Sequence, residues 1–120
     1  KTDFVRLDNN KTIIRQDSIL YIQKDGMKSI FYTDTREYET YCSFKTIMLQ
    51  LPSHFIQCHK SYIVNINKIA SIDTTNNTIL LDSKKQGSKC YIGPKYKSKL
   101  MEVLNYGNFT NNLECNDNSK

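Results

Sequence analysis

Histidine and cysteine are the side chains best suited to catalysis or metal binding in this sequence, and they are few. The chain has two histidines, His54 and His59, and four cysteines scattered over 120 residues without a Cys-x-x-Cys pair. Cys58 and His59 are neighbours in an expected strand, so their side chains should point to opposite faces. We therefore expect Cys58 to point inward, and the sequence predicts neither an enzyme nor a metal or cofactor site.

Lysine and tyrosine support a different chemistry, the binding of a nucleic acid. The residues concerned lie at expected turns between strands and are Lys60, Lys95, Lys97 and Lys99, interleaved with Tyr62, Tyr91 and Tyr96. These side chains could contact phosphates and sugars, and His59 could donate or accept a hydrogen bond at a base edge. The same lysines could instead only keep the edges of a sheet soluble. Composition alone does not separate these two interpretations.

The charge distribution favours an anionic partner for the second half of the chain. Seventeen Lys and Arg against twelve Asp and Glu give a net charge of +5 and a pI near 9.0. Residues 41–104 hold nine lysines against three acidic residues, which is +6, whereas residues 1–40 sum to zero. Apolar runs are only a few residues long and no secretion signal is evident. We therefore expect a cytoplasmic protein without a membrane-spanning segment.

The scaffold for these residues is predicted to consist mainly of short strands. β-Branched and aromatic stretches alternate with Asn-, Asp- and Gly-rich turns. The expected strands are 3–7, 11–15, 19–24, 29–34, 37–42, 55–59, 61–65, 70–73, 78–82 and 89–92. This regular spacing favours an all-β sandwich or barrel with minor helices over a βαβ fold.

Two segments have helical features. Ser43 can cap a short helix whose apolar face, Phe44, Ile47, Met48 and Leu51, ends at Pro52. The second helix is expected over residues 94–104, with Pro94 in its first turn. Because few apolar residues follow, we expect one folded domain over residues 1–104 and a polar, disordered tail over residues 105–120.

The most informative segment runs from Phe55 to Ile72. Its first eleven residues fit the pattern F-x-R-x-H-x-S-[FY]-[IV]-V-N, except that Gln57 stands at the Arg position. This segment closely resembles the signature of LytTR domains, the DNA-binding output modules of bacterial response regulators. Residues 19–23 resemble the family's "IxYIE" strand, residues 43–51 its short helix and residues 91–100 its "PVSRxYxxxL" closing motif. The resemblance covers roughly residues 3–104.

Part of the signature also has a structural explanation. Its alternating apolar residues are expected in the core, namely Tyr62, Val64, Ile66, Ile69 and Ile72. Asn65 is expected to hydrogen-bond a turn and not to touch DNA.

The resemblance implies a mainly β, elongated, multi-sheet antiparallel fold with one or two short helices, and loops that enter successive major grooves. The family's base-contacting positions correspond here to Lys24–Ser29, to Lys60 after the signature His59, and to Lys95. Lysine lacks the planar donor fork of arginine, so the base readers do not carry over unchanged. We expect Lys28, Ser29, His59 and Lys60 near base edges. The full expected DNA-binding set is Lys24, Lys28, Ser29, His59, Lys60, Lys95, Tyr96, Lys97 and Lys99, with Lys95, Lys97 and Lys99 on phosphates.

The resulting hypothesis is a transcriptional role. The chain would be the DNA-binding domain of a two-component response regulator, with a receiver domain before Lys1. It would be monomeric in solution and bind paired direct repeats of double-stranded DNA, two copies to an operator. The competing hypothesis is a protein interaction module that docks a partner by strand addition. Salt should weaken DNA binding steeply and strand pairing hardly at all.

Overall fold

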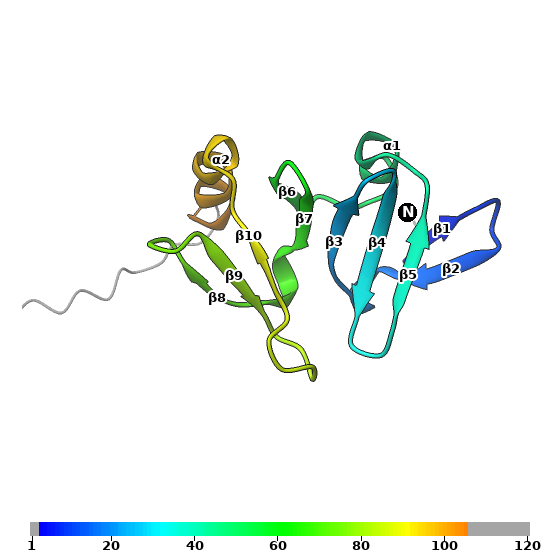
Figure 1. Ribbon diagram of the computed structural model, residues 1–120, viewed down its shortest axis with the longest axis horizontal. Helices are drawn as coiled ribbons and strands as arrows, with labels where there is room; N and C mark the ends of the chain where they lie inside the picture. The colour runs from blue at the N-terminus through cyan, green and yellow to red at the C-terminus, as the bar shows by residue number, and fades with distance from the viewer. Residues whose placement is uncertain (1–2, 106–120) are drawn as a thin grey trace, which may run out of the picture.

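The computed structural model of the protein describes residues 3–105, which form three antiparallel sheets and two helices (Figure 1). The predicted fold, mainly β and elongated with several antiparallel sheets and short helices, is confirmed. The strands are β1 (Phe4–Leu7), β2 (Thr12–Arg15), β3 (Ile19–Asp25), β4 (Lys28–Thr33), β5 (Glu37–Thr40), β6 (Phe55–His59), β7 (Tyr62–Asn65), β8 (Ile69–Asp73), β9 (Thr78–Leu81) and β10 (Lys89–Tyr91). The helices are α1 (Phe44–Met48) and α2 (Pro94–Asn105).

The sheets follow one another along the chain and across the molecule. Strands β1 and β2 form a hairpin, the second sheet has the order β5-β4-β3-β7-β6, and the third has the order β10-β9-β8. Figure 1 shows the three-stranded sheet on the left, the five-stranded sheet in the middle and the hairpin on the right. Within the described residues, no helix is long and apolar enough to cross a membrane.

Two hydrophobic clusters hold these sheets together. The first cluster consists of Val5, Leu7, Ile14, Ile19, Ile22, Phe31, Phe44, Ile47, Phe55 and Ile63. The second cluster consists of Leu20, Cys58, Val64, Ile79, Leu81, Cys90, Ile92 and Leu100. Successive residues of a strand face opposite ways, so β7 contributes Ile63 to the first cluster and Val64 to the second. The inward position of Cys58 is confirmed by its complete burial.

The signature's expected core residues are only partly correct. Val64 is fully buried, whereas Tyr62, Ile69 and Ile72 are half-buried against the second cluster, and Ile66 is half-buried. Ile63 was not expected in the core, because an alternating pattern identifies one face of a strand and β7 is covered on both. Asn65 does stabilise a turn: its Nδ2 donates to the Ile19 carbonyl at 2.8 Å and its Oδ1 accepts from the Asn67 backbone at 3.0 Å.

Helix α1 is shorter than predicted. The Ser43 Oγ accepts a hydrogen bond from the Thr46 backbone N–H at 3.2 Å, which confirms the expected cap. The helix ends at Met48, and the N–H groups of residues 49–51 bond to carbonyls three residues earlier. This tightening leaves Leu49 85% exposed, while Leu51 still packs against the first cluster. Helix α2 includes Asn105, the first residue of the expected tail; residues 106–120 lie outside the described residues.

Candidate nucleic-acid interface

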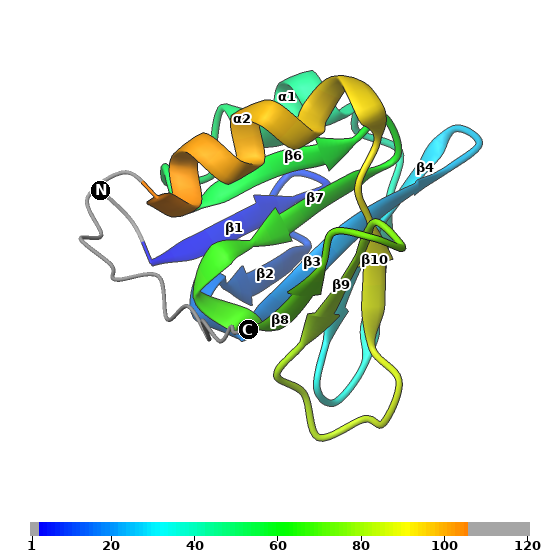
Figure 2. The ribbon, with the colours of Figure 1, turned by 90° about the vertical axis from the view of Figure 1, so that its left-hand side faces the viewer.

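Three turns from separate parts of the chain meet along one edge of the molecule. They are the β3–β4 turn, the β6–β7 turn and the β10–α2 junction, and we call residues 24–29, 59–61 and 93–99 together the basic edge. The Lys24 N–H donates to the Ser61 carbonyl at 2.8 Å, and the Gly93 N–H donates to the Cys58 carbonyl at 2.8 Å. Figure 2 shows the β3–β4 turn and the start of α2 at the same upper end of the molecule.

The basic edge is hollowed where these turns adjoin. One hollow of about 370 Å³ is lined by Lys24, Gly26, Lys60 and Ser61. A second hollow of about 460 Å³ is lined by His59, Lys60, Gly93, Pro94, Lys95 and Tyr96. Lys60 borders both, so the structure brings together five of the expected residues, namely Lys24, His59, Lys60, Lys95 and Tyr96.

His59 has a fixed orientation in this edge. Its Nδ1 accepts a hydrogen bond from the Ser61 N–H at 2.9 Å, so the proton of the neutral ring is on Nε2 and can be donated outward. Gln57, which replaces the basic residue of the LytTR pattern, supports the same turn. Its Nε2 donates to the carbonyls of His59 at 3.2 Å and Lys60 at 3.4 Å. The departure at Gln57 therefore stabilises the turn that presents His59 and Lys60.

Gly93 allows β6 and α2 to approach closely. A Cβ atom at this position would lie 3.2 Å from Cδ2 of Tyr96 and 3.4 Å from Cα of His59. The Gly93 carbonyl also accepts from the Tyr96 N–H at 2.9 Å, at the start of α2. The lack of a side chain at Gly93 is what allows α2 to lie beside His59.

The three lysines of α2 do not act as one group. Lys95 and Lys99 are exposed and four residues apart, so they share one face of the helix. Lys97 extends the other way, because its Nζ donates to the Thr74 carbonyl at 2.9 Å and ties α2 to the β8–β9 turn. Only Lys95 and Lys99 therefore present their charges together at this end of the basic edge.

The tyrosines expected near the lysines are largely engaged with one another. The Tyr62 ring lies 5.3 Å from the His59 ring, 5.7 Å from the Tyr91 ring and 6.0 Å from the Tyr21 ring, measured between centroids. Burial is the main cause of a raised pKa for the Tyr62 hydroxyl, with the neighbouring Tyr91 as a second cause. The Tyr62 ring is thus occupied by its neighbours, whereas Tyr91 is 40% exposed and Tyr96 lines the second hollow.

The β3–β4 turn differs from the expectation in two respects. Lys28 forms an ion pair with Glu39, with 3.2 Å between Nζ and Oε1, and this hydrogen bond raises the pKa of Lys28. Ser29 is 98% buried, and its Oγ donates to the Cys42 carbonyl at 2.8 Å. A position at a base edge does not fit Ser29, because its hydroxyl is turned into the protein.

A third hollow joins the β3–β4 turn to the segment before α1. It measures about 180 Å³ and is lined by Lys24, Gly26, Met27, Lys28, Ser29, Tyr41, Cys42 and Ser43. Met27 is 83% exposed and Tyr41 is 76% exposed. Met27 lies within the loop 24–29 that the resemblance indicated, but it was not singled out, and Tyr41, two residues before the Ser43 cap, was missed.

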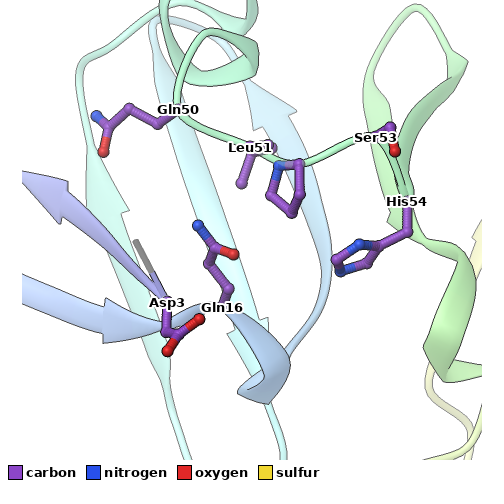
Figure 3. A pocket seen from close by; sticks show the side chains of 7 residues that line it. Asp3, Gln16, Gln50, Leu51, Ser53 and His54 are labelled. Atoms are coloured by element: carbon purple, nitrogen blue, oxygen red, sulfur yellow. The ribbon is translucent and has the colours of Figure 1, made fainter. Parts of the chain in front are cut away.

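A further hollow shares no residue with the basic edge. It measures about 550 Å³, and Figure 3 shows Gln16, Leu51 and His54 around it. Burial lowers the pKa of His54, which leaves its ring neutral at pH 7. In the part of the chain from residue 3 to residue 105, no three His, Cys, Asp or Glu side chains are grouped to hold a metal ion. The polar groups of this hollow are two amides, one hydroxyl, one imidazole and the Asp3 carboxylate, and the lining residues that the structure describes offer no cation for DNA.

Comparisons with known proteins point to one family. A family model described as "LytTr DNA-binding domain" matches residues 9–105. "Accessory gene regulator protein A" of Staphylococcus aureus strain N315 is 27% identical over 94 residues, and its Staphylococcus epidermidis counterpart is 26% identical over the same length. These matches cover 77% of this chain but only 38% of each relative. The structure of a LytTr DNA-binding domain from Bacillus cereus superposes with a TM-score of 0.72, at 24% identity, over 88% of this chain and all of that one.

Proposed function

Because the chain belongs to the family of LytTR DNA-binding domains, we propose that it is the sequence-specific DNA-binding part of a two-component transcriptional regulator. The family is one of DNA-binding regulators and not of enzymes. The observation that carries the proposal is the continuity of the basic edge, in which three turns surround two hollows that share Lys60. Protruding turns that carry cations fit the major groove, whose walls are phosphates and whose floor is base edges.

The groups on this edge divide into two kinds of contact. Lys95 and Lys99 lie on an exposed helix face and would neutralise phosphates. His59 and Lys60 protrude from the β6–β7 turn and would reach base edges, where both offer hydrogen-bond donors. Donors match the N7 and O6 acceptors of guanine better than the mixed pattern of adenine. Lys24 would contact DNA beside the β3–β4 turn, where Lys28 is held by Glu39.

The length of the relatives supports a further domain beside this one. The curated relatives are named as gene regulators, and this chain spans 38% of their length. We propose that a receiver domain accompanies this domain in a cytoplasmic regulator, and that two copies, each monomeric in solution, occupy paired direct repeats.

The test is selection of duplexes from a random pool, followed by fluorescence anisotropy at two salt concentrations. We expect enrichment of a short motif, repeated in direct orientation, and an affinity that falls steeply with salt, with a slope of about 0.9 for each phosphate contacted. The control for variants of the basic edge is Lys84→Ala with Lys85→Ala, since it removes two exposed lysines that lie outside that edge. No enrichment, together with binding that ignores salt, would replace the proposal with strand addition to a protein partner.

A further inference from the structure

The third hollow combines apolar exposure with positive charge. Six large hydrophobic side chains of the described residues are exposed, and only Met27 and Tyr41 among them line a hollow of the basic edge. Lys24 lines this hollow as well as the one shared with Lys60. An exposed thioether and an exposed aromatic ring therefore lie where a DNA groove would pass.

The hollow has a fixed shape. The β3–β4 turn is a two-residue loop in which Gly26 has φ +65°, as a type II′ hairpin turn requires at its first position. On the opposite wall, Tyr41 is followed by Cys42, whose carbonyl accepts from the buried Ser29 Oγ. The next residue, Ser43, is fixed as the cap of α1. The backbone on both walls is thus held by hydrogen bonds, and it positions Met27 and Tyr41 at the rim of the hollow.

Polar recognition is weak at this hollow. The Lys28 ammonium is already paired with Glu39, and the Ser29 hydroxyl is turned inward. Of the other exposed lining residues, Ser43 is occupied as the cap of α1 and Lys24 also lines the adjacent hollow, so the Met27 side chain and the Tyr41 ring supply exposed apolar surface here. In the major groove of DNA the only apolar group that distinguishes one base from another is the C5 methyl of thymine.

We propose that Met27 and Tyr41 form a thymine-reading site, in which the C5 methyl of one thymine packs between the thioether and the ring. Lys24, at the border of the adjacent hollow, holds a phosphate nearby. This inference rests on the proposed function, because it requires the basic edge to face a major groove. It assigns to the β3–β4 end of the basic edge the recognition of an apolar group, which a lysine ammonium cannot provide.

The test uses deoxyuridine, which pairs like thymine and lacks only the C5 methyl. Each thymine of the selected duplex is replaced singly by deoxyuridine, and affinities are measured by anisotropy with the whole chain. We expect one position in each repeat at which the wild-type chain loses affinity about fourfold, the effect of exposing one methyl group to water. Met27→Ala and Tyr41→Ala should bind the thymine and deoxyuridine duplexes equally at that position.

Matched variants separate this readout from general effects. Leu49→Ala removes an equally exposed apolar side chain outside the basic edge and should retain the fourfold difference. Tyr41→Phe keeps the ring and should retain it as well. A wild-type chain that binds its selected duplex but ignores every deoxyuridine would overturn the inference and leave the proposed function standing. Sensitivity that survives in both alanine variants would also overturn it, whereas failure to select any duplex would remove the proposed function itself.

Discussion

The two ends of the basic edge use their lysines differently. At the α2 end, Lys95 and Lys99 are exposed, and the residues that the structure describes offer them no ion pair. At the β3–β4 end Lys24 is exposed as well, but Lys28 is bound to Glu39, and Met27 and Tyr41 expose apolar surface. Unpaired lysines attract the phosphates of any DNA, whereas an apolar surface can distinguish only particular bases. We infer that affinity arises mainly at one end and selectivity mainly at the other.

The largest effect is expected at the α2 end. Lys95→Ala with Lys99→Ala should weaken binding to every duplex by roughly tenfold to fiftyfold at 0.1 M salt and reduce the salt slope by about 1.8, because two phosphate contacts are lost. Anisotropy titrations against selected and random duplexes measure both quantities. Preference between the duplexes should be unchanged. A change in preference instead would show that this end also reads bases.

A smaller effect is expected when Lys28 is released from its ion pair. Glu39→Gln removes the carboxylate and should raise affinity for random duplexes about threefold to tenfold, with a steeper salt dependence, because a free ammonium becomes available for a phosphate. Glu37→Gln, on the same strand, is the charge-matched control. Equal gains from both variants would mean that net charge and not the ion pair is responsible, and the contrast between the two ends would weaken.

The contact at Asp34, which joins the five-stranded and three-stranded sheets, should contribute less to stability at low pH. Asp34 Oδ1 accepts from Ser83 Oγ at 2.8 Å and from the Lys84 N–H at 2.9 Å, and these bonds lower the pKa of Asp34. A lowered pKa in the folded state means that Asp34 stabilises the fold above pH about 4 and that this stabilisation is lost as the pH falls below its ordinary pKa.

Denaturant unfolding between pH 3 and pH 7 measures this contribution. Asp34→Ala should be less stable than wild type at pH 7, and the difference should shrink at pH 3. The affinity of the Asp34→Ala chain for random duplexes at pH 7 should change little if each end of the basic edge acts through its own side chains. A large loss would indicate that spacing between the ends also matters.

The smallest effect concerns thiol reactivity. A hydrogen bond with Cys58, together with burial, raises the pKa of the Cys90 thiol, which disfavours its reactive thiolate. Cys42 is half-buried and lines the hollow of the β3–β4 end. In a Cys115→Ser chain, alkylation should therefore modify Cys42 first, and bound DNA should slow that reaction severalfold. Protection of Cys42 by DNA, followed by mass spectrometry, would place that end against the duplex.

The sequence predicted the fold well where local signals agreed. The strand boundaries came from β-branched runs between Asn- and Gly-rich turns, and the Ser43 cap marked the start of α1. Errors arose where tertiary contacts decide. Ile63 is buried because β7 is covered on both faces, and α1 tightens after Met48 instead of continuing to Leu51. No local pattern carries this information.

The candidate site shows the same division. The resemblance located Lys60 and Lys95, which the fold brings to one hollow. It could not show that Ser29 is turned inward, that Lys28 is neutralised from β5, or that Lys97 bonds to the β8–β9 turn. Each of these contacts joins residues that are at least eleven positions apart, so only the folded chain reveals which side chains remain available.

The strands shared by both clusters bear on how the domain unfolds. Strand β3 contributes Ile22 to the first cluster and Leu20 to the second, and β7 contributes Ile63 and Val64 in the same way. Loss of either cluster exposes one face of both strands, so the two halves should unfold in a single cooperative transition. Amide hydrogen exchange should be slowest in β3 and β7, where only global opening admits water.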